Sequence, residues 1–252
     1  MIDLDKIRTP GLGPAANLKS INPPGKAADA IIGRIPVGIS PIALTFSKDE
    51  KWLFTTSEVA PPNWKWPPAL AREGAPRGGA TEPEGAVVVI DVTKAKTDPK
   101  DSVVARVPGG GSPVRSTLSP DGSRLFVTAR NSNALMVFNT TELIKNHDQA
   151  RPTKIPVGPS PVPLVLVMDG KLALIGNSNR FSANAAKSSI ITVLDTSCIG
   201  TDRDPKLGEI PCGAFPREFH LSADGKTLFL TNCRSDTLQV IDAGRLMEIL
   251  RK

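Results

Sequence analysis

Glu218 and His220 are the residues of this 252-residue chain whose types and spacing best suit acid–base chemistry. They stand two positions apart, so in a β-strand their side chains would share one face. A carboxylate and an imidazole so placed can exchange a proton with a bound molecule. Arg115 aligns with Glu218 in another copy of a sequence repeat and can join the same site. The alternative for His220 is a structural hydrogen bond between neighbouring units of the fold.

A set of arginines predicts a second kind of chemistry, the binding of an anion. Arg115 and Arg217 lie near the start of predicted strands, and three others lie in predicted loops: Arg130, Arg180 and Arg234. The planar guanidinium binds a carboxylate or a phosphate through two parallel hydrogen bonds. If these arginines converge over one opening, they form a site for a small anionic ligand or an acidic protein partner. Otherwise they are separate, solvated surface residues.

A proline-rich insertion over residues 59–84 is the third candidate, and it holds Trp64 and Trp66. Its prolines predict a loop rather than a strand or an ordinary helix. A tryptophan carries a large apolar surface and a polar N–H, which suits a binding lid. The alternative is that both rings pack against the body of the protein.

An internal repeat must position these candidates, and its four copies begin at Pro41, Pro113, Pro161 and Pro216. Each copy has an alternating apolar segment, a turn at Asp-Gly or its equivalent, an apolar strand, a loop and a third strand that ends in Asp or Asn. Asp-Gly tolerates positive φ, which predicts type I′ hairpin turns. A further strand is predicted beside each copy, over residues 31–38, 103–109, 153–158 and 207–213.

Four short antiparallel strands per repeat predict an all-β fold, a β-propeller with about four blades. A β-sandwich is the alternative, but it does not need near-identical units. We expect one propeller domain over residues 1–252. Its expected parts are a remnant or outer strand of a preceding blade at 1–38, a blade at 39–109 that carries the 59–84 insertion, blades at 110–158 and 159–213, and a blade at 214–252 without its outer strand.

The repeated motifs also carry a family resemblance over about residues 31–243. Ile-Pro-Val-Gly-x-x-Pro, Ser-Pro-Asp-Gly, Leu-Phe-Val-Thr and Val-Ile-Asp resemble the YVTN-repeat β-propeller family, related to the lactonase-type seven-bladed propellers. Phe or Ala replaces the Tyr for which the repeat is named. The resemblance implies the fold, and it suggests a lactonase-like activity and an extracytoplasmic or periplasmic location. No catalytic motif of the family can be carried over residue by residue, and residues 1–19 do not predict a signal peptide.

The two ends of the repeat leave the closure of the ring open. Residues 1–4 resemble the end of a third strand, and a short helical segment follows the last repeat. The chain is therefore expected to be part of a seven-bladed ring, or a four-bladed ring in which residues 28–38 pair with the last blade. A third reading is two chains that complete one larger ring through their open blade edges, because exposed strand edges favour association.

Composition excludes several classes of function. The net charge of +6 comes from scattered basic residues, which does not predict nucleic-acid binding. No apolar run approaches the roughly 18 residues of a membrane span. Two histidines and three cysteines without a CxxC motif predict no metal site, no haem and no other cofactor. The cysteines are buried thiols or include one disulfide, and the candidates are Cys198, Cys212 and Cys233.

Two functions remain open at this point. The first is a non-catalytic binding module with a ligand or partner site on the loop face of the propeller, where rigidly held loops usually carry function. The second is a lactonase-like hydrolase or lyase whose acid/base site, built from Glu218, His220 and Arg115, lies at the channel mouth. The enzyme requires these three side chains to meet in one pocket.

Overall fold

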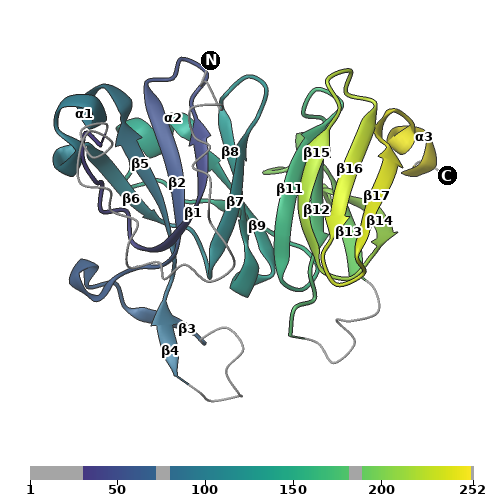
Figure 1. Ribbon diagram of the computed structural model, residues 1–252, viewed down its shortest axis with the longest axis horizontal. Coiled ribbons are helices and arrows are strands. Elements are labelled where there is room, and N and C mark those ends of the chain that lie inside the picture. Colours follow the sequence, from purple (N-terminus) through teal and green to yellow (C-terminus); the bar gives the residue numbers. More distant parts are fainter. Residues whose placement is uncertain (1–30, 72–79, 182–188, 251–252) are drawn as a thin grey trace, which may run out of the picture.

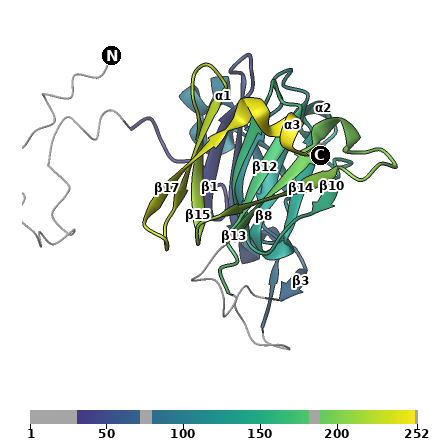
Figure 2. The ribbon, with the colours of Figure 1, turned by 90° about the vertical axis from the view of Figure 1, so that its right-hand side faces the viewer.

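The computed structural model describes residues 31–71, 80–181 and 189–250, and two views show how its sheets are arranged (Figures 1 and 2). Three four-stranded antiparallel sheets and one three-stranded sheet follow one another along the chain, and a two-stranded hairpin extends from the first sheet. The predicted all-β architecture of propeller blades is therefore confirmed. Each large sheet is one blade, and we number the blades 1 to 4 in chain order.

Each blade runs from an inner to an outer strand in chain order. Blade 1 contains β1 (Ile39–Phe46), β2 (Trp52–Val59), β5 (Ala86–Asp91) and β6 (Val103–Pro108). Blade 2 contains β7 (Pro113–Leu118), β8 (Arg124–Ala129), β9 (Ala134–Asn139) and β10 (Thr153–Pro156). Blade 3 contains β11 (Pro161–Val167), β12 (Leu172–Asn177), β13 (Ser189–Asp195) and β14 (Lys206–Cys212). Blade 4 contains β15 (Pro216–Leu221), β16 (Thr227–Asn232) and β17 (Thr237–Asp242).

The Asp or Asn that ends each third strand starts a short helical segment. Asp91 Oδ1 accepts a hydrogen bond from the Lys94 N–H at 2.9 Å, and Asn139 Oδ1 accepts one from the Glu142 N–H at 3.1 Å. Such side chains satisfy N–H groups that have no partner inside a helix. The α-helices are α1 (Val92–Thr97), α2 (Thr140–Lys145) and α3 (Leu246–Leu250). The 3-10 turns are η4 (Pro62–Trp64), η5 (Pro99–Asp101), η6 (Arg130–Ser132), η7 (Thr196–Cys198) and η8 (Ala243–Arg245).

Consecutive blades pack face to face, and the inner strands β1, β7, β11 and β15 contact one another in that order. A middle strand such as β12 is consequently buried along its whole length, on both faces. One apolar cluster fills each junction; representative members are Val89 and Leu125 between blades 1 and 2, Phe126 and Ile175 between blades 2 and 3, and Leu174 and Leu230 between blades 3 and 4. Full burial of one such side chain contributes about 1.5–3 kcal/mol, so the junctions supply much of the stability.

The turn between the first two strands departs from the predicted type I′ geometry in blade 2. The Gly122 N–H donates to the Ser119 carbonyl at 2.8 Å, and in this turn only Gly122 has positive φ, 77°. Pro120 and Asp121, the two central residues of this turn, therefore lack the positive φ of a type I′ turn. Gly122 follows them in the left-handed conformation, just before the next strand. In blade 3 the expected geometry occurs, because Met168 and Asp169 both have positive φ, 53° and 52°.

A serine and an aspartate close the turn of blade 2. Ser119 Oγ donates to Asp121 and accepts a hydrogen bond from the Arg124 N–H at 3.0 Å. Asp121 also accepts from the Ser123 hydroxyl at 2.7 Å. The hydrogen bonds from Ser119 and then Ser123 hold the pKa of Asp121 well below its usual range. Two further blades repeat the arrangement with Ser47 and Asp49, and with Ser222 and Asp224.

Two predictions for blade 1 are wrong. Residues 31–38 were expected to form a strand, but they are not paired as one; instead Ile35 and Val37 pack against the cluster of Val88 and Ile90 on β5. The 59–84 insertion was expected to be a loop, but it contains the hairpin β3 (Pro68–Ala71) and β4 (Thr81–Pro83). The prolines stand at strand ends, where a missing N–H disrupts little pairing. The predictions for residues 1–4 and 28–30 lie outside the described residues.

We predict that the Asp121 carboxylate stabilises its turn down to strongly acidic pH. Its folded-state pKa is depressed, so its contribution is present above the unfolded pKa of about 3.9 and is lost as pH falls through the folded pKa. Asp121→Asn should therefore lower the free energy of unfolding by a constant amount between pH 7 and about pH 5. Urea denaturation at several pH values measures this difference. The control Asp202→Asn should change little, and a difference that disappears already at pH 5 would contradict the prediction.

Candidate functional site

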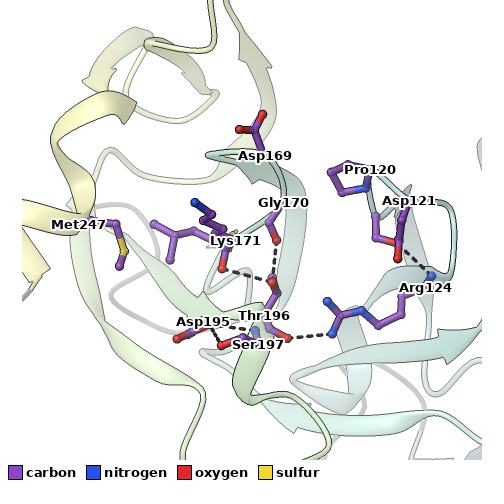
Figure 3. Close-up of a pocket in the computed structure, with 12 residues that line it drawn as sticks. Pro120, Asp121, Arg124, Asp169, Gly170, Lys171, Asp195, Thr196, Ser197 and Met247 are labelled. Atoms are coloured by element: carbon purple, nitrogen blue, oxygen red, sulfur yellow. Dashed lines mark hydrogen bonds between the residues drawn. The ribbon is translucent and has the colours of Figure 1, made fainter.

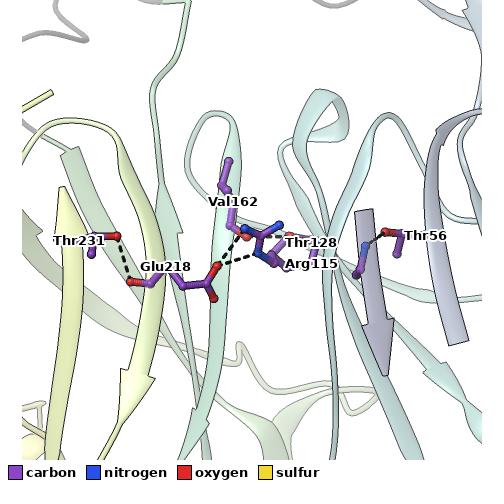
Figure 4. Close-up of polar contacts among 7 residues, drawn as sticks. Thr56, Arg115, Thr128, Val162, Glu218 and Thr231 are labelled. Carbon is purple, nitrogen blue, oxygen red and sulfur yellow. Dashed lines mark hydrogen bonds and ion pairs between the residues drawn. The ribbon is translucent and has the colours of Figure 1, made fainter. Parts of the chain in front are cut away.

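Arg115 and Glu218 meet on the inner strands of the propeller arc, as Figure 4 shows. Arg115 Nε and Nη2 donate to Glu218 Oε2 at 3.1 and 2.9 Å. Since β7 belongs to blade 2 and β15 to blade 4, the ion pair reaches across the inner strand of blade 3. Both side chains are partly exposed, so the pair contributes only about 0.2–1 kcal/mol of stability. The carboxylate expected to act as an acid or base is already bound to a guanidinium.

Threonines of the second strands position these inner residues. Thr128 Oγ1 accepts from the Arg115 N–H at 3.1 Å and donates to the Val162 carbonyl at 3.0 Å, which ties β7 to β11 (Figure 4). In blade 1, Thr56 Oγ1 accepts from the Ala43 N–H at 3.1 Å. The strand pairing shifts register beside Arg115, and such an irregularity re-aims the side chain that follows it. The inward direction of Arg115 therefore comes from the backbone.

His220 does not complete an acid/base site with these two residues. It is exposed on β15, opposite Phe229 of β16, and the described residues provide it with no hydrogen-bond partner. The predicted hydrogen bond between blades is thus not formed in the described part of the chain. Glu218, His220 and Arg115 also line neither of the two cavities analysed below.

The other predicted arginines have local partners of their own. Arg130 is buried and forms an ion pair with Glu58, with 3.0 Å between Nη2 and Oε1. The guanidinium carbons of Arg217 and Arg234 lie 5.2 and 4.7 Å from the ring centre of Phe215. Arg180 lies over the ring of Phe181 in the same manner, at 5.4 Å. A cation over an aromatic face is attracted by the ring quadrupole, so Arg217 and Arg234 share one aromatic partner and Arg180 has another.

We predict that Arg130 has a structural role. Arg130→Met should lower the free energy of unfolding by about 3 kcal/mol, because it leaves the partly buried Glu58 carboxylate without its partner. Arg234→Met, at an exposed site, should cost less than about 1 kcal/mol. Urea denaturation of the two variants measures both values. Equal effects would show that Arg130 is an ordinary surface arginine.

Trp64 and Trp66 pack edge to face, with ring centres 5.4 Å apart and an angle of 60° between the ring planes. Both contact the apolar cluster on β5 that Ile35 and Val37 also cover. The guanidinium carbon of Arg106 lies 5.1 Å from the centre of the Trp64 ring. Trp64 therefore has the packing role that was the alternative to a binding lid, whereas Trp66 also lines a cavity.

The cavity beside Trp66 has a volume of about 360 Å³, and we call it the Trp66 cavity. Its lining combines an apolar wall, cations and two acids: Trp66, Pro67, Pro108, Arg106, Arg151, His147, Glu84 and Asp148. Arg151 Nη1 donates to the backbone carbonyls of Asp148 and Ala150 at 3.1 and 2.9 Å. In the described part of the chain, neither Arg106 nor Arg151 forms an ion pair with a carboxylate. Their guanidinium groups can therefore receive an external anion.

His147 adds a third polar group to the Trp66 cavity. Its Nδ1 is buried and has no hydrogen-bond partner among the described residues, and its Nε2 lies 3.7 Å from Asp148 Oδ1. A buried polar atom without a partner is unfavourable, and a ligand or a water molecule can satisfy it. The sequence contained no signal for this grouping, because Arg106 lies on an outer strand and Arg151 follows a helix of another repeat.

A second cavity, of about 510 Å³, lies among the turns of blades 2 and 3 beside Met247, as Figure 3 shows. Several of its polar groups are already engaged with one another. Arg124 Nη1 donates to the Thr196 carbonyl at 2.8 Å, and Ser197 Oγ donates to Asp195 at 2.6 Å. The Ser197 hydroxyl holds the pKa of Asp195 below its usual value. The carboxylates of Asp121 and Asp195 are therefore ionised and serve the turns.

The cysteines and the search for a metal site give no further chemistry. Cys198, Cys212 and Cys233 are free thiols, the first two buried and the third exposed. Burial raises the pKa of Cys212 to about 12, so this thiol is not a nucleophile at neutral pH. Across residues 31–71, 80–181 and 189–250, no cluster of three or more His, Cys, Asp or Glu side chains could hold a metal ion. Within the same residues, no helix is long and apolar enough to cross a membrane.

Comparison with known proteins supports the fold. The sequence matches no established protein family and no curated protein. Hydrazine synthase of Kuenenia stuttgartiensis superposes with a TM-score of 0.55 at 21% identity, over 81% of this chain and 46% of its own. A putative 6-phosphogluconolactonase of Bacteroides uniformis superposes with a TM-score of 0.55 at 17% identity, over 80% and 50%. A structure of the nidogen/laminin complex gives 0.51 at 14% identity, over 81% and 61%.

These comparisons limit what can be inferred about this chain from the solved structures that it resembles. The chain spans about half the length of the solved structures that it resembles. At such low identity the likeness shows the β-propeller fold and carries no information on activity. The function must therefore be inferred from this chain's own residues.

Proposed function

We propose that this chain is a non-catalytic β-propeller binding module whose Trp66 cavity holds a small anionic ligand. The observation that carries the proposal is the placement of Arg106 and Arg151 on one cavity, beside the flat ring of Trp66. Neither guanidinium is paired with a carboxylate of the described residues. A guanidinium recognises a carboxylate or a phosphate through two hydrogen bonds, which gives both affinity and orientation.

The size and the lining of the cavity define the ligand class. A volume of about 360 Å³ lies at the small end of the range of small-molecule sites, about 300–1,000 Å³. Trp66, Pro67 and Pro108 supply an apolar wall, which suits a flat ring. Glu84 and Asp148 line the same cavity; they disfavour a ligand of high negative charge, and each can accept a hydrogen bond from a ligand hydroxyl. A monoanionic or dianionic ligand with a ring fits this set of groups best.

The cavity lies between two elements that are fixed by backbone hydrogen bonds. The insertion that carries Trp66 is fixed at its base, because the Ala60 N–H donates to the Glu84 carbonyl at 3.1 Å. The next residue, Gly85, donates to the Gly110 carbonyl at 2.8 Å and accepts from the Gly109 N–H at 2.8 Å. Arg106 lies on β6 within the sheet of blade 1. Binding therefore requires little ordering of the backbone, which favours affinity.

We predict that phenyl phosphate binds at the Trp66 cavity and quenches tryptophan fluorescence. Arg106→Met and Arg151→Met should each weaken binding about ten- to hundredfold, because each removes a charge-assisted pair worth about 1.5–3 kcal/mol. The matched control is Arg234→Met, an exposed arginine far along the chain, which should bind as the unchanged protein does. Isothermal titration calorimetry measures the affinities. Equal binding by all three variants would overturn the proposed site.

The second candidate function is a lactonase-like hydrolase or lyase, and the Arg115–Glu218 pair is the observation that favours it. Arg115 donates a hydrogen bond to Oε2 of Glu218, and His220 stands two residues after Glu218 on the same strand. If this site is catalytic, the protein should release acid from a six-membered sugar lactone faster than the uncatalysed reaction does. Glu218→Gln and His220→Ala should each reduce that rate at least a hundredfold.

The two functions predict opposite results when phenyl phosphate binding and lactone opening are both measured. A binding module saturates with phenyl phosphate but does not accelerate lactone opening, and its binding is unchanged by Glu218→Gln. A catalytic protein accelerates lactone opening, and Arg106→Met leaves that rate unchanged. A pH-indicator assay in weak buffer follows the acid that is released.

A further inference from the structure

Exposed apolar side chains gather on the two end faces of the arc of blades. We call the face of a blade that looks toward the preceding blade its leading face, and the face that looks toward the following blade its trailing face. The leading face of blade 1 presents Ile42, Leu44 and Phe46 of β1, which are 38%, 71% and 53% exposed. The trailing face of blade 4 presents Leu238 and Val240 of β17, which are 59% and 62% exposed. Soluble chains rarely expose such groups together unless they form an interaction site.

The strand register shows that these positions are buried wherever another blade follows. Val240 pairs with Phe229, and the corresponding pairs are Val89 with Phe54, Val137 with Phe126 and Val193 with Leu174. The three equivalent valines are at most 5% exposed. Leu238 is likewise equivalent to Val87, Leu135 and Ile191, all fully buried. The trailing face of blade 4 therefore has the composition of a junction, without the blade that would cover it.

The leading face of blade 1 shows the same relation. Phe46 pairs with Leu53, and its equivalents are Leu118, Leu166 and Leu221. Those three leucines are partly covered by the preceding blade, whereas Phe46 is exposed. Since each junction in the chain joins a trailing face to a leading face, the two open faces are a matching pair.

Residues 31–38 and the edge of β17 form a second matching pair. Residues 31–38 contain Ile-Pro-Val-Gly, as the outer strand β10 and the residues after it do. Ile155 of β10 packs on the following blade, and Ile35 packs on blade 1 in the same way. In the described part of the chain, β17 is an edge strand without an outer neighbour. Residues 31–38 therefore occupy the place of an outer strand, and the described residues contain no sheet of their own for it.

We propose that two copies of this chain join head to tail into one closed ring. The trailing face of blade 4 in each copy packs on the leading face of blade 1 in the other, and residues 31–38 add an outer strand to the partner's β17. Two such contacts use both open faces of both copies, so a two-fold axis closes the assembly. A contact within one chain is disfavoured, because blades 1 and 4 stand at opposite ends of the arc (Figure 1).

The size of related structures agrees with this assembly. The aligned part of the chain spans 46% and 50% of two solved structures with similar blades, so two such parts match the length of one. The register of the new strand pair follows from the existing sheets, in which Val87 pairs with Val107, Leu135 with Ile155 and Ile191 with Ile210. The equivalent pair in the assembly is Leu238 of one copy with Ile35 of the other.

Light scattering tests the stoichiometry. The chain should elute with twice the 26.7-kDa mass, and Leu238→Asp with Val240→Asp should convert it to a monomer with an unchanged circular dichroism spectrum. Phe181→Asp is the matched control, because it changes an exposed apolar residue that lies on neither face. It should leave the mass doubled. If the unchanged chain remains a monomer even at about 100 μM, the proposal is overturned. A dimer that survives the double substitution would overturn it as well.

Disulfide cross-linking tests the register independently of the folding of those variants. Ile35→Cys and Leu238→Cys are made in separate chains that also carry Cys233→Ser, and the two chains are then mixed. A covalent dimer should form only in the mixture, because each link then joins two copies. If one chain carrying both cysteines instead forms the link internally, with no gain in mass even at high concentration, the ring closes within a single copy and the proposal is wrong.

Discussion

Each inner blade lies between two others, so both faces of its sheet must be apolar. This constraint explains why β8 and β12 are nearly continuous apolar runs rather than strands of alternating polarity. It also explains the spacing of the repeat, since every blade must offer the same pair of faces to its neighbours. The Ser-x-Asp turns and the capping Asp residues serve the same end, because they fix where each strand begins and stops.

The junctions leave few places for chemistry. Side chains of the middle strands are buried between the blades, so functional groups must lie on inner strands, on turns or at the outer edge. On the inner strands, Arg115 and Glu218 neutralise each other. On the turns, Asp121 and Asp195 are bound by serines. At the outer edge, Arg106 and Arg151 have no carboxylate partner in the described part of the chain, which is why that edge is the best candidate for a ligand.

The repeat made the blades predictable, because packing imposes its period directly on the sequence. The roles of individual side chains were less predictable. Arg130 looked like a ligand-binding loop residue, but its partner Glu58 belongs to a different blade, and no spacing in one repeat indicates that contact. Arg106 was not identified because outer-strand positions vary between repeats. Trp66 was predicted to belong to a binding lid; it lines a cavity, and its role in binding stays a prediction.

The insertion connects the ligand cavity with the open end of the arc. Trp64 packs in the cluster of the leading face and contacts Trp66 edge to face, while Trp66 lines the cavity. Any blade that covers the leading face would press on the cluster that holds Trp64, and through it would restrict Trp66. A ring already held in its binding geometry costs less ordering when a ligand arrives. Closure of the ring and affinity at the Trp66 cavity are therefore expected to be coupled, and the Trp64–Trp66 contact is the element that would carry the coupling.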